Sequence, residues 1–498
     1  MFDLSCVVFS FLHVVYSAEN DGDSHRDSVV KIYTSQSTPD PFRPWTNNDS
    51  QGMRHMGTGF VIEGNRILTN AHVAGHATEL LIESEQLPRK LSATLEHIAY
   101  DVDVAVLRVE TPEFFDMHPP VRFQTELPKE QDQVKALGYP IGGDVMSTTV
   151  GVVSRIEHGR YWNGHDDLQV QVDAALNGGN SGGPIFSGDA CIGMSMAGYN
   201  NQDANSIGYL IPSLVIQRTL DDFADGHYHG DPELGAKLIG TENPALRKSL
   251  GLSLMDSGMT VVSADPESGL QPWDVITQIG PSSIDDTGYG QAYGLRLSYP
   301  ALISAFANAD ATVEVQVIRA GESQPLTVKL TKDADELMLF PKNASYEFEY
   351  FVVGPFVLVA ATEQHANLAY DDAWGRSLVF TSSPLATRRM DRKAFEDEQI
   401  VVLSTSPFSH PVLRGYDKLQ SCMAIQSING EPVKNIQHAR ALILACKDEW
   451  IDLEFSNSPS EVLRLDLQQL FDSTQEVLEK NSIRNPSSPG LEMPFYQD

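Results

Sequence analysis

Short alternating runs of apolar and polar residues dominate the first half of the chain. The run from Gly57 to Asn70 predicts two strands joined by a turn at Glu63–Asn65. A stretch rich in Pro, Asn and Asp, residues 39–52, predicts a loop, and the first helical periodicity comes at Ser213–Phe223. Further strands are predicted at 28–33, 80–83, 91–97, 104–109, 134–137, 148–155, 168–172 and 190–196. Many short strands before one helix predict a β-barrel or a pair of barrels.

The pattern changes after Glu233. Residues 234–330 mix strands with two helical stretches, at 244–250 and 300–307, which predicts a separate α+β domain of about 100 residues. A second unit of this kind is predicted at 346–482. Its strands are expected at 351–360, 400–404 and 424–428, before a helix at 436–446. The segments that begin at Val275 and Met423 occupy similar places in the two units, which indicates a duplicated module. The last dozen residues, rich in Pro, Ser and Asn, predict disorder.

Composition limits the classes of function. With 498 residues, 41% of them hydrophobic, the chain is expected to form two to four folded domains. Its 67 acidic and 35 basic residues give a net charge of −32, which disfavours nucleic acid as a partner. The four cysteines form no C-x-x-C pair, which disfavours a structural cysteine–zinc site. Cys422 and Cys446 are either a disulfide pair or two buried thiols.

The N-terminus carries one apolar run, Cys6 to Val15, followed by the small residues Ser17 and Ala18. This order is typical of a secretory signal, so residues 1–18 are predicted to be a signal peptide, although Asp3 stands where a basic residue is expected. The run is too short to span a bilayer, and we expect no membrane span elsewhere. An exported, periplasmic location is predicted, with an organellar or cytoplasmic location as the alternative.

A glycine-crowded stretch, N-G-G-N-S-G-G-P at 177–184, surrounds a single serine, Ser181. Glycines allow close backbone approach and unusual torsion angles. An acyl-transfer site needs such a projecting serine together with backbone N–H groups aimed at the developing negative charge. Taken alone, the stretch is equally compatible with a glycine-rich surface loop.

Two upstream residues supply partners for this serine. His72 ends the run R-I-L-T-N-A-H, and Asp103 stands directly before the apolar strand V-A-V-L. A histidine that accepts the serine proton, held by a buried carboxylate, activates the hydroxyl as a nucleophile. Asp101, two positions earlier, is the rival acid. The alternative reading is that the histidine is an ordinary strand-end residue and the aspartate a turn acid.

The same serine satisfies G-x-S-x-G, the nucleophile elbow of α/β-hydrolases. That motif requires a helix directly after the serine and places the acid and histidine later in the chain. Here Gly182, Gly183 and Pro184 follow, which prevents a helix from starting at the serine. The order His, Asp, Ser in a β-rich chain therefore argues against the elbow.

Several stretches closely resemble the HtrA/Deg family, which are trypsin-like serine proteases with C-terminal PDZ domains. They are T-N-A-H at 69–72, D-V-A-V-L at 103–107, L-G-Y-P-I-G-G at 137–143, G-V-V-S-R at 151–155 and the glycine stretch. The runs at 208–216, 242–250, 350–357 and 428–435 resemble the branch with one ordinary and one divergent PDZ domain, best known from plants. The resemblance covers about residues 28 to 480.

The resemblance implies roles for individual residues. His72 would be the general base, Asp103 its orienting acid and Ser181 the nucleophile. The oxyanion hole would be formed by the backbone N–H groups of Gly179 and Ser181, with Asn180 between them. Gly178 stands where much of the family has proline, which we take to favour a loop that alternates between ordered and disordered states.

The substrate pocket is expected to differ from that of proteases that prefer basic residues. Ala175, six residues before the nucleophile, carries no charge, and Ser195 and Met196 are expected to edge the pocket. We therefore expect a small or medium aliphatic residue before the cleaved bond.

The two downstream units are expected to be PDZ-like domains, which bind extended C-terminal peptides beside a carboxylate-holding loop. In the first unit that loop would contain Leu234, Gly235 and Ala236. In the second unit the matching place is V-G-P-F at 353–356, where Pro355 lacks an N–H, so this unit is expected to serve assembly. The alternative is that both units are only packing modules.

The expected fold is mainly β: a double β-barrel trypsin-like protease domain at 24–225, PDZ-like domains at 230–334 and 343–482, and a disordered tail at 483–498. The expected function is ATP-independent cleavage of unfolded or damaged proteins, with no metal or other cofactor. The resemblance implies trimers or multiples of trimers. Two rival functions are a holding chaperone with weak protease activity and an esterase for small acyl esters.

Overall fold

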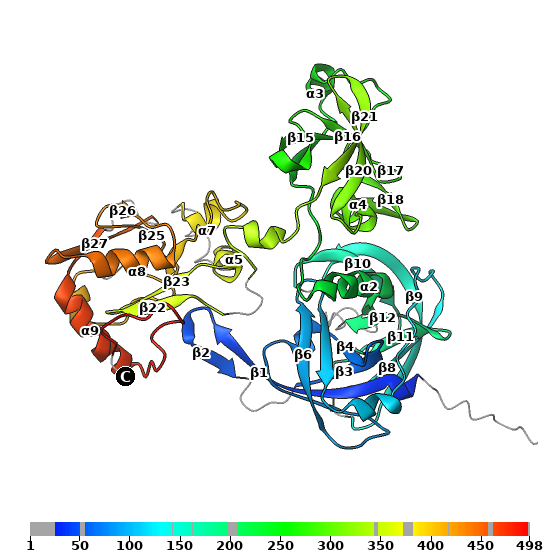
Figure 1. Cartoon of the computed structure of the whole chain (residues 1–498), viewed down its shortest axis with the longest axis horizontal. Coiled ribbons are helices and arrows are strands. Elements are labelled where there is room, and N and C mark those ends of the chain that lie inside the picture. Colours follow the sequence, from blue (N-terminus) through cyan, green and yellow to red (C-terminus); the bar gives the residue numbers. More distant parts are fainter. Residues whose placement is uncertain are drawn as a thin grey trace, which may run out of the picture.

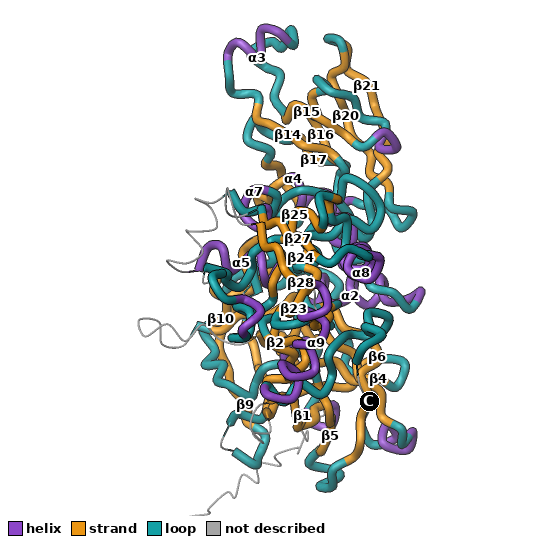
Figure 2. Tube along the Cα trace, turned by 90° about the vertical axis from the view of Figure 1, so that its left-hand side faces the viewer, coloured by secondary structure: helices purple, strands orange, loops and turns teal. Residues whose placement is uncertain are grey.

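The structure is a computed structural model that describes residues 25–49, 55–141, 143–161, 163–196, 207–342, 347–371, 382–416, 418–456 and 462–496. The predicted signal peptide, residues 1–18, lies outside the described residues. Figure 1 shows three bodies in chain order, and in both views the middle body stands at one end of the molecule with α3 at its tip (Figure 2). No helix in the described ranges has both the length and the apolar character needed to cross a bilayer.

The first body contains two closed barrels of six strands each, as the strand pattern predicts. In the first barrel the order β1-β3-β4-β7-β6-β5 is closed by pairing of β1 with β5. Buried aliphatic side chains, among them Ile32, Ile67 and Leu107, alternate inward and fill it. Its strands are β1 (Val29–Asp40), β3 (His55–Ile62), β4 (Arg66–Thr69), β5 (Ala77–Glu83), β6 (Leu91–Ala99) and β7 (Val104–Val109).

The second barrel closes in the order β10-β13-β12-β11-β8-β9, and helix α2 (Ser213–Asp222) follows it as predicted. Two of its strands, β11 and β13, were not predicted because four or five residues beside Gly and Pro are too few to show an alternating pattern. The strands are β8 (Gln133–Gly138), β9 (Ser147–Arg160), β10 (Asp166–Val172), β11 (Pro184–Ser187), β12 (Ala190–Met196) and β13 (Gly208–Pro212).

The loop prediction for residues 39–52 is wrong over most of its length. Strand β1 continues to Asp40, turns, and pairs with β2 (Arg43–Asp49) as a hairpin that leaves the barrel. The turn is held by the carboxylate of Asp40, which accepts the backbone N–H of Phe42 at 2.8 Å. The hairpin reaches the third body, where Phe42 and Trp45 pack against the core (Figure 1). Burial in a distant domain therefore overrides the local loop signal.

The middle body is a separate α+β unit built on a six-stranded sheet, in agreement with the predicted change of character after Glu233. Buried Val261, Ile276 and Val315 pack beneath helix α4, the second of the two predicted helices. The elements are β14 (Ala236–Gly240), α3 (Pro244–Ser249), β15 (Met259–Ala264), β16 (Val275–Ile279), β17 (Ser282–Ser283), β18 (Tyr289–Ala292), β19 (Leu295–Ser298), α4 (Tyr299–Phe306), β20 (Thr312–Arg319) and β21 (Glu322–Lys329).

The third body combines a three-stranded and a four-stranded sheet with several helices. Its predicted strand at 351–360 is in fact a hairpin, because Gly354 adopts a φ of +55° and reverses the chain. The elements are β22 (Tyr350–Val353), β23 (Phe356–Ala360), α5 (Glu363–Asp371), α7 (Pro384–Thr387), β24 (Val401–Leu403), β25 (Ile425–Ile428), β26 (Glu431–Pro432), α8 (Ile436–Ala445), β27 (Trp450–Phe455), β28 (Val462–Asp466) and α9 (Leu467–Lys480).

The predicted disordered tail is instead packed on the third body as far as residue 496. Leu491 and Met493 are buried in its core. The hydroxyl of Tyr496 donates to the carbonyl of Val352 at 2.6 Å and accepts the N–H of the same residue at 3.0 Å. Three apolar anchors in an otherwise polar stretch are too few to show in composition, which is why the prediction failed.

Cys422 and Cys446 do not form a disulfide. Cys422 is fully buried, whereas Cys446 is half-buried and its thiol accepts a hydrogen bond from the side-chain amide of Asn429 at 3.2 Å. Of the two alternatives, the structure therefore supports two thiols rather than a disulfide pair, and one of these thiols is only partly buried.

The contact between the β1–β2 hairpin and the third body depends on a buried neutral histidine. His365 Nδ1 accepts the backbone N–H of Thr362 at 3.3 Å, which leaves Nε2 to donate to the carbonyl of Pro41 at 3.1 Å. Burial lowers the pKa of His365 from 6.5 to about 4, because the surrounding apolar groups, including the ring of Phe42, cannot solvate a charged imidazole.

We expect acid to detach the hairpin. Because the folded pKa of His365 is about 4 and the unfolded value 6.5, the unfolded chain binds a proton first, and stability is lost as pH falls through this window. The full loss is about 3 kcal/mol. Hydrogen exchange of residues 43–49, followed between these two pH values, measures it. His365→Gln is expected to flatten the dependence, and His438→Gln, in the same body, to leave it unchanged. An equal dependence in all three proteins would contradict this account.

Candidate active site

A histidine and a buried aspartate form a hydrogen-bonded pair at the mouth of the first barrel. His72 lies on the short helix α1 (Ala71–Ala74), and Asp103 precedes β7. The Nδ1 of His72 is 2.8 Å from Oδ2 of Asp103, which is completely buried. Because a carboxylate can only accept, Nδ1 carries the proton, and Nε2 is left as the basic atom.

Backbone contacts lock this pair in place. The N–H of His72 donates to Oδ1 of Asp103 at 2.9 Å, and the side-chain amide of Asn70 donates to the carbonyl of Asp103 at 3.1 Å. Asp103 adopts a φ of +57°, a left-handed conformation that aspartate tolerates better than most residues. The rival acid, Asp101, is directed elsewhere, and its carboxylate accepts the hydroxyl of Tyr228 at 2.6 Å. The structure thus pairs Asp103, not Asp101, with His72.

The glycine stretch lies across the junction of the two barrels, next to α1. The N–H of Thr58, on β3, donates to the carbonyl of Ser181 at 2.9 Å, and its hydroxyl donates to the carbonyl of Gly179 at 2.7 Å. Gly182 has a φ of +83° and approaches so closely that a Cβ there would lie 2.1 Å from the carbonyl oxygen of Thr58 and 3.2 Å from the N of Asn70. Only glycine fits, and this close approach places the glycine stretch against Asn70, which directly precedes α1, the helix that carries His72.

The stretch offers free backbone donors beside the serine. Within the described ranges, the N–H groups of Gly179 and Ser181 have no hydrogen-bond acceptor, whereas the N–H of Asn180 donates to the carbonyl of Asn177 at 3.0 Å. Gly179 has a φ of +95°, and a Cβ there would lie 2.4 Å from the carbonyl of Tyr139. The geometry therefore favours Gly179 and Ser181, rather than Asn180, as donors to an oxyanion.

The residues expected to edge the substrate pocket have different environments. Ser195 is buried, its backbone pairs with Gly182 and Gly183, and its hydroxyl donates to the carbonyl of Asn180, so it supports the glycine stretch. Met196 is also buried, and Ala175 is exposed. Residues 197–206, which follow Met196, lie outside the described residues.

Gly178 is compatible with proline. It does not have a positive φ, and a Cβ there would touch only the flexible side chain of Ile141, at 3.0 Å. If the loop alternates between ordered and disordered states, Gly178→Pro is expected to raise basal peptide hydrolysis about two- to five-fold, because proline removes roughly 0.4–1 kcal/mol of loop entropy. Hydrolysis measured with and without an activating C-terminal peptide tests this. Unchanged basal and stimulated rates would contradict the hypothesis.

The loop predicted to hold a peptide carboxylate lines a large cavity. Leu234, Gly235 and Ala236 face helix α4 across a space of about 1280 Å³ that the first and third bodies also border. Gly235 has a φ of +64°, and its carbonyl accepts the N–H of Asp265 at 2.7 Å. From the third body, Arg392 pairs with the carboxylate of Asp265 at 2.7 Å, which places a cation at the edge of this loop.

A partly buried ion network forms another wall of the cavity. Arg218, on α2, contacts Asp167 at 2.6 Å and Asp231 at 3.1 Å. Burial works to lower the pKa of Arg218, but the two carboxylates outweigh it, so its pKa lies well above the ordinary value. The network ties Asp231 of the linker to Asp167 on β10 of the second barrel, and removing one partner would leave a partly buried charge unpaired.

Sequence reasoning missed the residues that position the site. Thr58 stands between two glycines in the run G-T-G at 57–59. Such flanking glycines indicate close backbone packing, so this sequence signal could have pointed to Thr58. Asn70, in T-N-A-H, also precedes the predicted base. The anchoring of Tyr228 to Asp101 has no local signal, since the two residues are far apart in the chain.

Comparisons with known proteins find two domain families and several relatives of the chain. The trypsin-like peptidase domain family matches residues 57–194, and a PDZ domain family matches residues 341–490. The chain is 34% identical to Protease Do-like 2, chloroplastic, of Arabidopsis thaliana over 454 residues, which cover 88% of this chain and 71% of the relative. It is 30% identical to Protease Do-like 4, mitochondrial, of the same plant, covering 94% and 86%. A solved HtrA-type protease, AlgW with a tripeptide, aligns at 22% identity and a TM-score of 0.46, covering 62% of this chain and 95% of that one.

Proposed function

Since this chain belongs to the HtrA/Deg family of Do-like serine proteases, we propose that it hydrolyses peptide bonds of unfolded or damaged proteins through an acyl-enzyme on Ser181. The observation that carries the assignment of roles is the His72–Asp103 pair, held at 2.8 Å with the aspartate fully buried, beside a glycine loop that presents one serine.

The reaction follows from this arrangement. With its Nδ1 proton held by Asp103, His72 takes the hydroxyl proton of Ser181 at Nε2 as the oxygen attacks the substrate carbonyl. The buried carboxylate stabilises the imidazolium that forms. The N–H groups of Gly179 and Ser181 donate to the oxyanion, and losing one such donor typically costs about 3 kcal/mol in the transition state. His72 then gives its proton to the leaving amine, and water releases the acyl group by the reverse sequence.

Digestion of a loosely folded protein tests the substrate class. We expect the purified chain to cleave casein without ATP and to leave a stable folded protein intact. If the wild-type protein cleaves no casein while both it and Ser181→Ala suppress aggregation of an unfolded protein, the chain acts as a holding chaperone. Turnover of short acyl esters without any cleavage of protein would instead support an esterase.

The middle body is proposed to bind the C-termini of substrate or regulatory peptides. Its cavity is bordered by Leu234, Gly235 and Ala236 on one side and by α4 on the other, the arrangement in which a peptide can add a strand beside a carboxylate-holding loop. The third body is proposed to serve assembly, because the N–H of Gly354 in its corresponding loop already donates to the hydroxyl of Thr474 at 2.8 Å.

Family membership supports proposals for assembly, substrate preference and compartment. We propose trimers or multiples of trimers, and a small or medium aliphatic residue before the cleaved bond, since Ala175, Ser195 and Met196 carry no charge. The relatives at 34% and 30% identity are named chloroplastic and mitochondrial, which supports the organellar alternative over a periplasmic location.

A further inference from the structure

The linker between the first and middle bodies carries an alternating motif, His227-Tyr228-His229. Tyr228 points toward the protease domain, where its hydroxyl donates to Asp101 at 2.6 Å and its ring lies 5.5 Å from that of Phe223. In an extended chain, neighbouring side chains point to opposite sides. Anchoring Tyr228 inward therefore presents both histidines on the other side, toward the end of the middle body.

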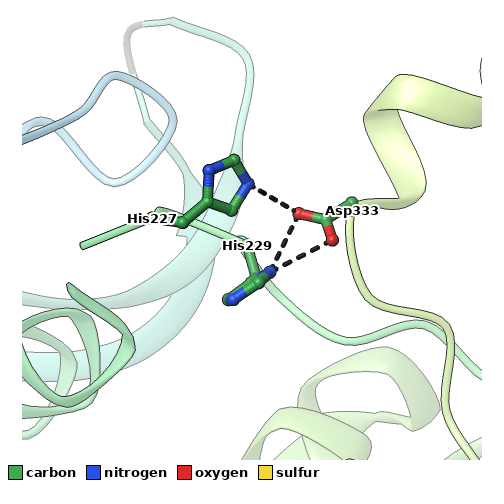
Figure 3. Close-up of side chains that lie close together, drawn as sticks. All are labelled: His227, His229 and Asp333. Carbon is green, nitrogen blue, oxygen red and sulfur yellow. Dashed lines mark hydrogen bonds and ion pairs between the residues drawn. The ribbon is translucent and has the colours of Figure 1, made fainter. Parts of the chain in front are cut away.

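The two histidines converge on one carboxylate, that of Asp333, which follows the last strand of the middle body (Figure 3). His227 Nε2 lies 3.0 Å from Oδ1 of Asp333, and His229 Nδ1 lies 3.0 Å from Oδ1 and 3.1 Å from Oδ2. The cluster is open to solvent, with 54% of the His227 side chain and 33% of the Asp333 side chain exposed. An ion from solution can reach it without any rearrangement of the core.

His229 faces a carboxylate at each of its ring nitrogens. Nδ1 faces Asp333, and Nε2 lies 3.0 Å from Oδ2 of Asp225. A neutral imidazole has only one N–H, so it can donate to only one of these two acids. The other contact brings a nitrogen lone pair against a carboxylate oxygen, and this needs either a second proton or a cation between the two atoms.

We propose that His227 Nε2, His229 Nδ1 and the carboxylate of Asp333 bind a divalent transition-metal ion of the zinc type, with water in the fourth position. Two imidazoles and one carboxylate suit Zn²⁺, whereas Ca²⁺ and Mg²⁺ prefer oxygen ligands. A tetrahedral ion with bonds of about 2.0–2.1 Å sets its ligand atoms roughly 3.3 Å apart. The two histidine–aspartate separations are 3.0 Å, and all three ligand atoms lie within 4.8 Å of one another, so side-chain rotations alone could bring them to this spacing.

A second shell for this site is already in place. Nε2–H of His229 donates to Asp225, the carboxylate–histidine arrangement that fixes the tautomer of metal-binding histidines. Asp222 accepts the backbone N–H groups of His229 at 2.8 Å and Gly230 at 3.1 Å, which holds the linker in shape. The absence of C-x-x-C pairs disfavours a cysteine–zinc site but has no bearing on a His–Asp site.

A second cluster in the described ranges, His165, Asp167 and Asp231, is the rival. There the guanidinium of Arg218 already lies between the two acids, 2.6 Å from one and 3.1 Å from the other. A divalent cation would have to enter beside that fixed positive charge. Among the described residues, no Arg or Lys forms an ion pair with His227, His229 or Asp333, so this cluster is the better site of the two.

Metal binding here would couple two domains. His227 and His229 belong to the linker that Tyr228 ties to Asp101, two residues before Asp103, while Asp333 follows the last strand of the middle body, beside the linker. An ion bound by these three ligands would cross-link the linker to the segment that follows the last strand of the middle body. It would therefore restrict movement of the middle body relative to the protease domain, and protect the linker from proteolysis.

Zinc titration of the full chain tests the proposal. We would use protein carrying Ser181→Ala, to prevent self-digestion, stripped of metal by a chelator and titrated with Zn²⁺ by calorimetry in mildly alkaline buffer. Co²⁺ absorption would report the coordination geometry. We expect one ion per chain, loss of that binding in His227→Ala, His229→Ala and Asp333→Asn, and an affinity about 10- to 100-fold lower in Asp225→Asn.

His165→Ala serves as the matched control and should bind as the parent protein does. Binding that persists in all ligand variants, or that is lost only in His165→Ala, would overturn the proposal. Failure of the parent protein to bind Zn²⁺ would also overturn it and would leave the cluster as a set of ion pairs to a doubly protonated His229. Far-ultraviolet circular dichroism of each variant separates loss of binding from loss of fold.

Discussion

Replacing Ser181 with alanine is expected to lower kcat for casein hydrolysis by about 10⁶-fold. In the proposed mechanism the hydroxyl oxygen attacks the substrate, and in other serine proteases the loss of this group alone costs about as much as the loss of the whole triad. Steady-state cleavage of a labelled casein measures the effect. The fold should survive, because Ser181 contributes its backbone, not its side chain, to the contact with Thr58 at 2.9 Å.

A control serine shows that the effect is local. Ser187, at the end of β11 in the same barrel, is expected to tolerate replacement by alanine with kcat within a factor of two or so, since substitutions away from the site seldom exceed roughly 0.5 kcal/mol. A Ser181→Ala protein that cleaves casein at an appreciable fraction of the wild-type rate would show that another residue is the nucleophile.

Asp103→Asn is expected to lower kcat by about 10⁴-fold. The amide keeps the shape of the carboxylate but can donate a hydrogen bond to Nδ1 of His72, which favours the wrong tautomer and leaves Nε2 protonated. The carboxylate also accepts the backbone N–H of His72 at 2.9 Å, so the rate loss combines a tautomer change with a less firmly placed histidine. Initial rates on a short chromogenic peptide measure it.

Asp101→Asn is the matched control for this prediction. Asp101 lies two residues away and bonds Tyr228 rather than His72, so the substitution is expected to weaken the linker contact and to leave kcat within about ten-fold of wild type. A larger loss in Asp101→Asn than in Asp103→Asn would reverse the assignment of the acid.

The proposed catalytic residues could be picked out from the sequence because each of them has a local signature. Glycines crowd Ser181, small residues surround His72, and an acid directly precedes a buried strand at Asp103. The structure adds the distances between these residues. It also shows that the N–H of Asn180 is not available to an oxyanion, because it donates to the carbonyl of Asn177 in a turn. Which backbone N–H groups remain without an acceptor depends on the turn geometry of the loop, and the amino-acid sequence alone does not determine that geometry.

Interdomain contacts could not be predicted in the same way. The residues 43–49 have a loop composition and become a strand only because Phe42 and Trp45 bury their rings in a body more than three hundred residues away in sequence. The prediction of a disordered tail after Ser482 is wrong for the same reason. Leu491, Met493 and Tyr496 pack into a core that is formed by residues elsewhere in the chain. The cluster at His227 and His229 is likewise completed by Asp333, about one hundred residues later.

The most direct measurement is labelling with a fluorophosphonate probe that reacts only with an activated serine. We predict one labelled residue per chain, identified as Ser181 by peptide mapping, with labelling lost in Ser181→Ala and strongly slowed in Asp103→Asn but not in Asp101→Asn. Labelling of a different serine, or no labelling of a protein that cleaves casein, would contradict the assignment of Ser181, His72 and Asp103 as the catalytic residues.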